Sequence, residues 1–246
     1  MGGREPRLLQ IRNIRHEKNN RPLKLKITNP KLALRCYVLL SRISLLLLFI
    51  WLRSKPPCEK RMPLEFKPKH DKIVELLLYL AHRRPGADKY QAVKFFYLAD
   101  REHFVRYGRP ITNETYYALS YGPVASTVLD LLNGNPWAFR SLGLDELPFE
   151  TELKDKTTII GKPNREIRRD IFSKTDLAVF DEVVEKHKDS SFDDLFKATH
   201  EHYAWSHAWN TRRQGKRAVM YYDEMIDDEQ KRAALLEDLL PVASKM

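Results

Sequence analysis

The chain has 246 residues, of which 43% are hydrophobic and 11% aromatic; this is enough to bury one ordinary core or two small ones, and it excludes disorder throughout. The net charge is +10, but it is unevenly distributed. Residues 1–61 hold 15 lysines and arginines against three acidic residues, a net charge of +12, which leaves 28 basic and 30 acidic residues, a net charge of −2, for residues 62–246. A domain that binds phosphates is normally basic itself, so residues 62–246 (the body) are not expected to bind nucleic acid.

Both cysteines, Cys36 and Cys58, precede the body. The body can therefore contain no disulfide, no thiolate nucleophile and no cysteine-ligated metal. This cysteine usage suits a cytoplasmic protein.

Residues 1–61 form a basic N-terminal extension that we expect to be mostly disordered. Its apolar stretch, 32–52, contains Arg35 and Arg42, which leave only ten uninterrupted residues, whereas a membrane-spanning helix needs about 20. Three interpretations stay open. The extension is sequence upstream of a true start at Met62, a membrane-surface or tail-like anchor, or a cleaved signal peptide without the expected cleavage site.

The body opens with a predicted helical hairpin. Apolar residues recur every three or four positions over residues 70–83, a pattern typical of a helix with one buried face, and Pro85-Gly86 ends that helix. Asp88 can cap a second helix, which Gly108 terminates.

Residues 115–121 are rich in tyrosine and threonine and favour a strand. They run into Gly122-Pro123, and proline at a first helical position predicts that a helix starts there and continues to Asn133. Residues 148–162 alternate loosely between apolar and polar side chains, which predicts a short β-hairpin.

Two capping boxes, Ser173 with Asp176 and Ser191 with Asp194, predict the starts of two further helices. A last helix is expected over about 228–240. The predicted fold class is therefore mainly α with a small β-sheet or hairpin, arranged as a compact single helical domain.

Asp100 and His103 lie near the end of the second predicted helix. Asp100 falls beside the buried stripe, where an unpaired carboxylate is costly, so it needs a partner. Two interpretations follow. Asp100 makes a structural hydrogen bond or ion pair, with Arg109 or a strand amide, or it is a catalytic carboxylate.

Three histidines, His200, His202 and His207, crowd one short segment together with Glu201. Helical zinc motifs place two histidines four residues apart, whereas these are two, five and seven apart. A separation of seven residues is roughly 10 Å along a helix, too far to share one ion unless the helix breaks. The simpler interpretation is that His200 and Trp205 are core residues whose polar atoms bond internally.

The junction Tyr121-Gly122-Pro123 is a third candidate site. Amides at a helix start can bind an anion, but Pro123 has no N–H and no glycine-rich phosphate loop is present. A packing junction is the better interpretation.

Two blocks of sequence carry a resemblance to a known family. The first consists of Lys94-Phe95-Phe96-Tyr97-Leu98-Ala99-Asp100, His103, Tyr107-Gly108-Arg109-Pro110-Ile111, Thr115-Tyr116, Ala118 and Tyr121-Gly122-Pro123-Val124. The second consists of Phe172-Ser173, Asp176-Leu177, Phe180-Asp181, Val183, Thr199-His200 and Trp205. Over roughly residues 69–209 the chain thus resembles the Panacea domain, also described as the SocA-like antitoxin domain, whereas residues 1–61 have no counterpart in it.

The resemblance implies an antitoxin of a bacterial or phage toxin–antitoxin pair, a cytoplasmic protein that is not an enzyme and needs no cofactor or metal. Its partner would be a protein toxin encoded nearby, neutralised by direct contact. The resemblance also implies a binding or family-motif polar centre, which Asp100, His103, Tyr121 and His200 would form or brace. The full set of residues is Asp100, His103, Arg109, Tyr116, Tyr121, Gly122, Pro123, His200 and Trp205.

Two alternatives remain beside simple toxin binding. One is a metal-dependent or acid/base hydrolase that uses Asp100, His103, His200 and Glu201. The other is an adaptor that delivers the toxin to a protease. Membrane contact depends on residues 32–52 alone.

Overall fold

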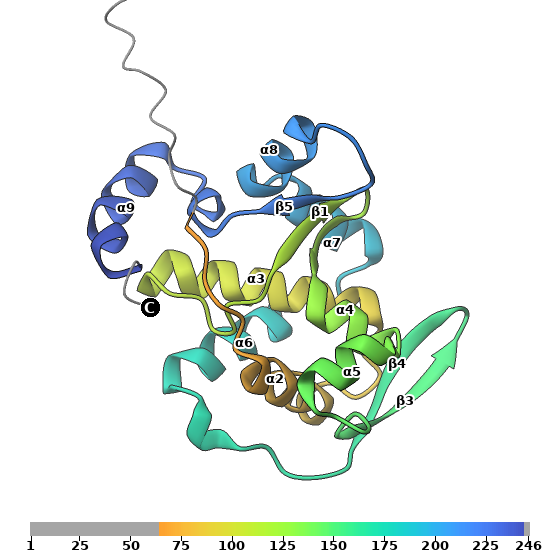
Figure 1. Cartoon of the computed structure of the whole chain (residues 1–246). Helices are drawn as coiled ribbons and strands as arrows, with labels where there is room; N and C mark the ends of the chain where they lie inside the picture. Colours follow the sequence, from red (N-terminus) through yellow and green to blue (C-terminus); the bar gives the residue numbers. More distant parts are fainter. Residues whose placement is uncertain (1–63, 244–246) are drawn as a thin grey trace, which may run out of the picture. The chain divides into compact units, whose positions relative to one another are not determined.

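The computed structural model describes residues 64–243, so the predicted basic extension and its apolar stretch lie outside the described residues. The described chain is mainly helical with two small antiparallel sheets, which confirms the predicted fold class (Figure 1). The helices are α2 (His70–Arg83), α3 (Lys89–Tyr107), α4 (Ser126–Leu132), α5 (Pro136–Leu142), α6 (Lys174–His187), α7 (Phe192–His200), α8 (Tyr203–Thr211) and α9 (Glu229–Ala243). The strands are β1 (Tyr116–Leu119), β2 (Gly122–Ala125), β3 (Phe149–Lys154), β4 (Thr157–Pro163) and β5 (Ala218–Met220), and the 3-10 turns are η1 (Arg169–Ile171) and η2 (Tyr222–Met225).

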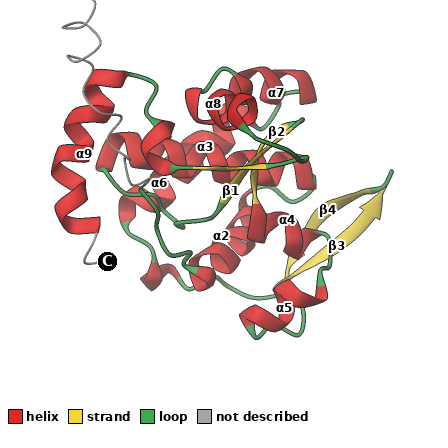
Figure 2. Cartoon of the chain, turned by 45° about the horizontal axis from the view of Figure 1, so that its top comes forward, coloured by secondary structure: helices red, strands yellow, loops and turns green. Residues whose placement is uncertain are grey.

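Helix α3 lies at the centre of the described chain. It packs against α6, α4, α7 and β2, and Figure 2 shows it running beside the sheet that contains β1. All six residues from Ala92 to Tyr97 are buried, so this helix is covered on every side rather than along one stripe. A helix in that position can place polar side chains deep inside the protein, where each needs a partner.

The two helices of the predicted hairpin form as α2 and α3, but α3 packs mainly against α6 and β2 rather than against α2. Asp88 accepts a hydrogen bond from the Gln91 amide, and the Gln91 side chain accepts from the Asp88 amide, which completes a capping box at the start of α3. Gly108 ends α3 with φ of 69°, a left-handed conformation that glycine adopts without strain.

The three-stranded sheet has the order β2-β1-β5, and both pairs are antiparallel. The predicted helix start at Gly122-Pro123 is wrong, because these residues belong to β2 and the helix begins at Ser126. Gly122 has φ of 95°, which lets the chain turn back after Tyr121 so that Leu119 pairs with Gly122. The pairing with β1 and the burial of the whole of β2 outweigh the preference of proline for a first helical position, and an edge strand tolerates the missing N–H.

The second sheet is the predicted hairpin, now resolved as β3 and β4. Its turn residues Asp155 and Lys156 both have positive φ (49° and 67°), as a two-residue type I′ turn requires. In Figures 1 and 2 the turn end of this hairpin points away from the helices.

The segment with three histidines is not one helix. Helix α7 ends at His200 and α8 begins at Tyr203, so the chain breaks between them. Helix α5 and strand β5 are further elements that the sequence reading did not foresee; Asn135 caps α5, and Pro136 stands at its first position. No helix within residues 64–243 is long and apolar enough to cross a membrane.

We expect Asp88→Ala to lower the free energy of unfolding by about 1 kcal/mol, because the Gln91 amide loses its acceptor. Asp88→Asn keeps an acceptor oxygen and serves as the matched control. Urea unfolding of both variants tests this, and equal losses in the two variants would contradict the capping role.

Candidate functional site

Three buried polar residues of α3 organise the candidate site: Lys94, Asp100 and His103. At a rise of 1.5 Å per residue, Asp100 lies about 9 Å along the helix from Lys94, and His103 about 4.5 Å further. Each meets a different segment of the chain. We call the resulting sets of contacts the tip group, the Asp100 group and the Asp176 group.

In the Asp100 group, one carboxylate holds the segment that leads into β1. Its Oδ1 accepts hydrogen bonds from the amides of Ile111 (2.8 Å) and Thr112 (2.9 Å). Its Oδ2 accepts from the hydroxyls of Thr112, Tyr116 (2.9 Å) and Tyr222 (3.2 Å). The hydrogen bonds from the Ile111 and Thr112 amides match the interpretation of Asp100 as a structural residue, although the carboxylate of Asp100 does not pair with Arg109.

Burial raises the pKa of Asp100, and the hydrogen bonds from Thr112, Tyr116 and Ile111 oppose that rise. A second buried carboxylate, Glu114, lies close by. Its Oε1 accepts from the Thr115 amide (2.7 Å) and the Thr127 hydroxyl (2.9 Å), whereas Oε2 has no hydrogen-bond partner among the described residues.

Burial raises the pKa of Glu114 to about 7, and the nearby charge of Asp100 adds to the rise, whereas the hydrogen bonds from Thr115 and Thr127 oppose it. With that pKa, Glu114 is partly protonated near neutral pH. The unbonded Oε2 and the nearby carboxylate explain why the charged form is unfavourable.

In the Asp176 group, the carboxylate of Asp176, which belongs to the capping box at the start of α6, connects α6 to α2 and α3. Asp176 accepts from Lys72 Nζ (2.6 Å) and Arg109 Nη2 (2.8 Å), and His103 Nε2 lies 3.2 Å away. His103 Nδ1 donates to the carbonyl oxygen of Arg109 (2.7 Å). Burial favours the neutral acid, but hydrogen bonds from His103, Lys72 and Ser173 outweigh it and hold the pKa of Asp176 well below its usual range.

The tip group surrounds the turn between β1 and β2. Lys94 Nζ donates to the carbonyl oxygens of Tyr121 (2.6 Å) and Pro123 (2.8 Å), and burial lowers the pKa of Lys94 to about 7. Gly122 passes so close that a Cβ there would lie 2.6 Å from Lys94 Nζ and 2.9 Å from His200 Cε1. Glycine is therefore required at position 122 by its neighbours as well as by its positive φ.

Two aromatic side chains from α7 and α8 cover the same turn. Trp205 Nε1 donates to the carbonyl oxygen of Leu119 (3.0 Å), and the His200 ring nitrogens lie 2.6 Å from the Phe196 oxygen and 3.4 Å from the Ser120 oxygen. Burial lowers the pKa of His200, and its hydrogen bonds to those two carbonyl oxygens oppose the change. These internal hydrogen bonds agree with the structural interpretation of His200 and Trp205.

Tyr121 is the exposed member of the tip group. Its side chain is 64% exposed and its ring lies 6.1 Å from that of Phe192, which is 48% exposed. The turn is thus held from inside by polar contacts, while its outer face presents aromatic surface.

The sequence-predicted site residues fall into these three groups rather than one shared centre. Asp100 and Tyr116 belong to the Asp100 group, and His103 and Arg109 to the Asp176 group. The remaining residues gather at the tip: Tyr121, Gly122, Pro123, His200 and Trp205. The spacing along α3 explains the separation, because Asp100 cannot reach the turn that Lys94 holds.

Several contributors to these groups were not among the predicted site residues, including Lys94, Lys72, Thr112, Asp176 and Tyr222. The sequence did carry a signal for Lys94, because a lysine inside the apolar run from Val93 to Tyr97 must be buried and needs a partner. Tyr222 is 122 positions from Asp100, and nothing in the local sequence connects them.

The break between α7 and α8 does not create a histidine cluster. His202 Nδ1 lies 3.1 Å from the Tyr97 hydroxyl, and His207 Nδ1 lies 2.7 Å from Glu224, so the histidines near the break serve different neighbours. Among the described residues, no three histidine, cysteine or acidic side chains are placed to hold one metal ion.

Comparisons with known proteins add one positive finding. Residues 93–206 match the sequence model of the family described as antitoxin SocA-like, Panacea domain, which confirms the resemblance noted from the sequence. The match begins at α3 and ends within α8, so it spans the tip group and most of the other two groups. Neither the curated proteins nor the solved structures gave a match.

The raised pKa of Glu114 has a definite sign. The carboxyl of Glu114 loses its proton near pH 4.5 in the unfolded chain but only near pH 7 in the folded protein. This group therefore lowers the free energy of unfolding as pH rises from 4.5 to about 7. We expect Glu114→Gln to remove that component, and the stability of the variant relative to wild type should rise by on the order of 2 to 3 kcal/mol from pH 4.5 to 8.

Urea unfolding of both proteins across that range measures the difference, in which the titration of other groups cancels. Glu150→Gln, at an exposed glutamate, is the control and should show no such trend. Parallel stability curves for wild type and Glu114→Gln would contradict the assignment.

Proposed function

We propose that this chain, whose residues 93–206 match the family described as antitoxin SocA-like, Panacea domain, is the antitoxin of a toxin–antitoxin pair and neutralises its toxin by direct binding in the cytoplasm. The family match is the observation that carries the proposal. The partner is a protein, consistent with the net charge of −2 on residues 62–246.

The contacts of the candidate site support binding rather than catalysis. The carboxylates of Asp100 and Asp176 accept several internal hydrogen bonds, and His200 faces backbone carbonyl oxygens. A general base or nucleophile must instead reach a substrate proton or electrophilic atom. These side chains are committed to holding the fold, which favours a role as positioning residues.

The tip group gives a physical reason for the composition of the family blocks. Three residues hold the turn between β1 and β2. Lys94 on α3 and Trp205 on α8 donate hydrogen bonds to its carbonyl oxygens, and Gly122 leaves the space in which the chain passes close to Lys94. A turn held in this way loses little conformational entropy on binding a partner, which improves affinity. The proposed role of these residues is to keep the binding surface in one shape.

Expression of the reading frame adjacent to this gene tests the proposal. We expect that product alone to stop growth, the full chain to restore growth, and the two proteins to co-purify as a stoichiometric complex. Unaltered toxicity in the presence of the folded full chain would contradict antitoxin function. If growth is restored, the half-life of the toxin distinguishes sequestration, in which the toxin persists, from delivery to a protease, in which it disappears.

A further inference from the structure

Strand β3 is an open edge of the second sheet. The other strand of that sheet, β4, is occupied on both sides, since Ile160 donates to the Ala87 oxygen (2.9 Å) and accepts from the Gly86 amide (2.7 Å). On the far side of β3, no further strand pairs within residues 64–243. Every residue of β3 after Phe149 is exposed.

The register shows which backbone groups face that open edge. Flanking a two-residue turn, Lys154 and Thr157 form a hydrogen-bonded pair, and such pairs alternate along an antiparallel ladder. Thr151 is opposite Ile160, whose N–H and carbonyl point to the other side of β4, in agreement with this alternation. The N–H and carbonyl groups of Thr151 and Leu153 therefore point outward from the sheet.

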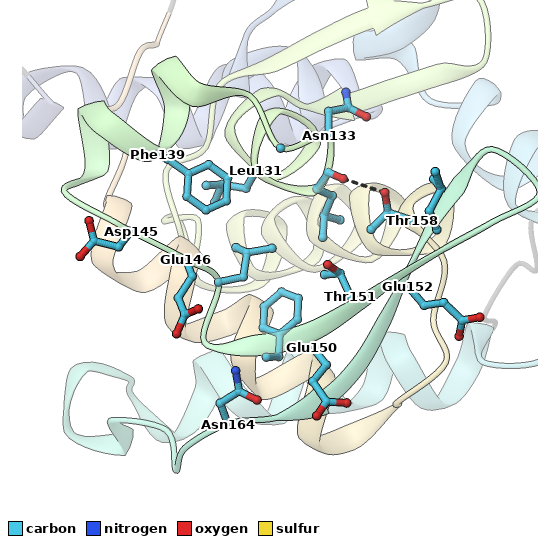
Figure 3. A pocket seen from close by; sticks show the side chains of 15 residues that line it. Leu131, Asn133, Phe139, Asp145, Glu146, Glu150, Thr151, Glu152, Thr158 and Asn164 are labelled. Carbon is cyan, nitrogen blue, oxygen red and sulfur yellow. Dashed lines mark hydrogen bonds between the residues drawn. The ribbon is translucent and has the colours of Figure 1, made fainter.

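A pocket of about 710 Å³ lies between this hairpin and helices α4 and α5 (Figure 3). Its apolar lining comes from α4, α5, the loop before β3 and both ends of β3, and consists of Leu131, Leu132, Phe139, Leu147, Phe149 and Leu153. Among the described residues, no basic residue lines the pocket. Four acidic residues do so, namely Asp145, Glu146, Glu150 and Glu152.

None of these four carboxylates forms an ion pair or side-chain hydrogen bond within the described chain. Among the nearby basic residues, Lys162 lies on β4 next to Pro163, which pairs with Phe149. Lys154 and Lys156 are at the turn end of the hairpin, and Arg140 lies over the ring of Trp137 (5.0 Å). Unpaired negative charge therefore borders the apolar lining, and Glu150 and Glu152 extend away from that lining (Figure 3).

Charged residues on an edge strand also prevent unwanted strand pairing. That explanation accounts for Glu150 and Glu152, but not for Leu153, whose side chain is 76% exposed next to an apolar pocket. A large exposed apolar side chain beside an open edge is the feature that protective charges normally avoid.

We propose that β3 and this pocket receive an extended, basic segment of the toxin, which adds a strand to the free edge of β3. Outward amide and carbonyl groups of Thr151 and Leu153 provide the main-chain hydrogen bonds, the pocket takes a large apolar side chain, and the acidic rim pairs with lysine or arginine. This proposal rests on the proposed antitoxin function and adds the β3 edge to the β1–β2 turn as a surface that contacts the toxin.

Two substitutions in the full chain separate the components of this surface. Leu153→Pro removes an outward N–H and leaves the hydrogen bonds to β4 in place, because the amide of Leu153 does not belong to that ladder. Leu153→Ala removes the side chain but keeps the amide, and is its matched control. The double variant Glu150→Lys, Glu152→Lys reverses the charge of the rim.

Affinity is measured against the purified product of the adjacent reading frame, with thermal unfolding of each variant as the check on folding. We expect Leu153→Pro to bind at least tenfold more weakly than Leu153→Ala, and the double charge variant to bind at least tenfold more weakly than wild type. Without any substitution, the amides of Thr151 and Leu153 should become protected from hydrogen exchange in the complex.

The outcomes separate this proposal from the proposed function. Suppose that the wild-type chain binds and neutralises the toxin, that folded Leu153→Pro and the folded double charge variant bind like wild type, and that the amides of Thr151 and Leu153 stay unprotected. The proposal of the β3 surface is then wrong, and the antitoxin function stands. If the wild-type chain neither binds nor neutralises the product, both proposals fail together. Loss of binding in folded variants with amide protection in wild type supports the β3 surface.

Discussion

The buried carboxylate of Asp100 is the contact on which the placement of the three-stranded sheet depends. The segment from Ile111 to Thr115 has no regular secondary structure, so the buried amides of Ile111 and Thr112 need an acceptor from elsewhere in the protein. Asp100 supplies that acceptor from the central helix and also receives the hydroxyls of Tyr116 on β1 and Tyr222 on η2. Through these hydrogen bonds, the side chain of Asp100 fixes the position of β1 along α3.

The other two groups extend the same arrangement along α3. Lys94 holds the end of the β1–β2 turn, and His103 meets the N-terminus of α6 through Asp176. Because all three buried residues stand on one central helix, a shift of α3 would disturb the sheet, its turn and α6 together. The family match runs from within α3 to the first turn of α8, so the matched region contains most of the residues that make these contacts.

The parts of the fold that were predictable are those that local chemistry determines. The capping boxes at Ser173 and Ser191 and the apolar periodicity of α2 each involve residues within one or two turns of each other. Strand β2 was missed because its conformation depends on pairing with β1, against the local preference of Pro123. Strand β5 pairs with β1 about a hundred positions away, which a local pattern cannot show. Helix α5, in contrast, carried a readable signal in Asn135-Pro136.

The candidate site divides in the same way. The need of Asp100 for a structural partner follows from its place on an apolar helix, and its bonds to the amides of Ile111 and Thr112 meet that need. Arg109 was an equally reasonable partner from spacing, but its guanidinium pairs with Asp176, a residue 67 positions later. The free edge of β3 could not be foreseen either, since an edge exists only once the neighbours of each strand are known.

Amide hydrogen exchange at Ile111 and Thr112 tests the central role of Asp100 most directly. Amides in irregular segments normally exchange through small local openings, whereas those bonded to a buried group exchange only when the surrounding structure unfolds. The account predicts that both amides exchange as slowly as those in the middle of α3, and that Asp100→Asn accelerates them more than it accelerates α2. Exchange of Ile111 and Thr112 in the wild-type protein at rates close to those of an unfolded chain would contradict it.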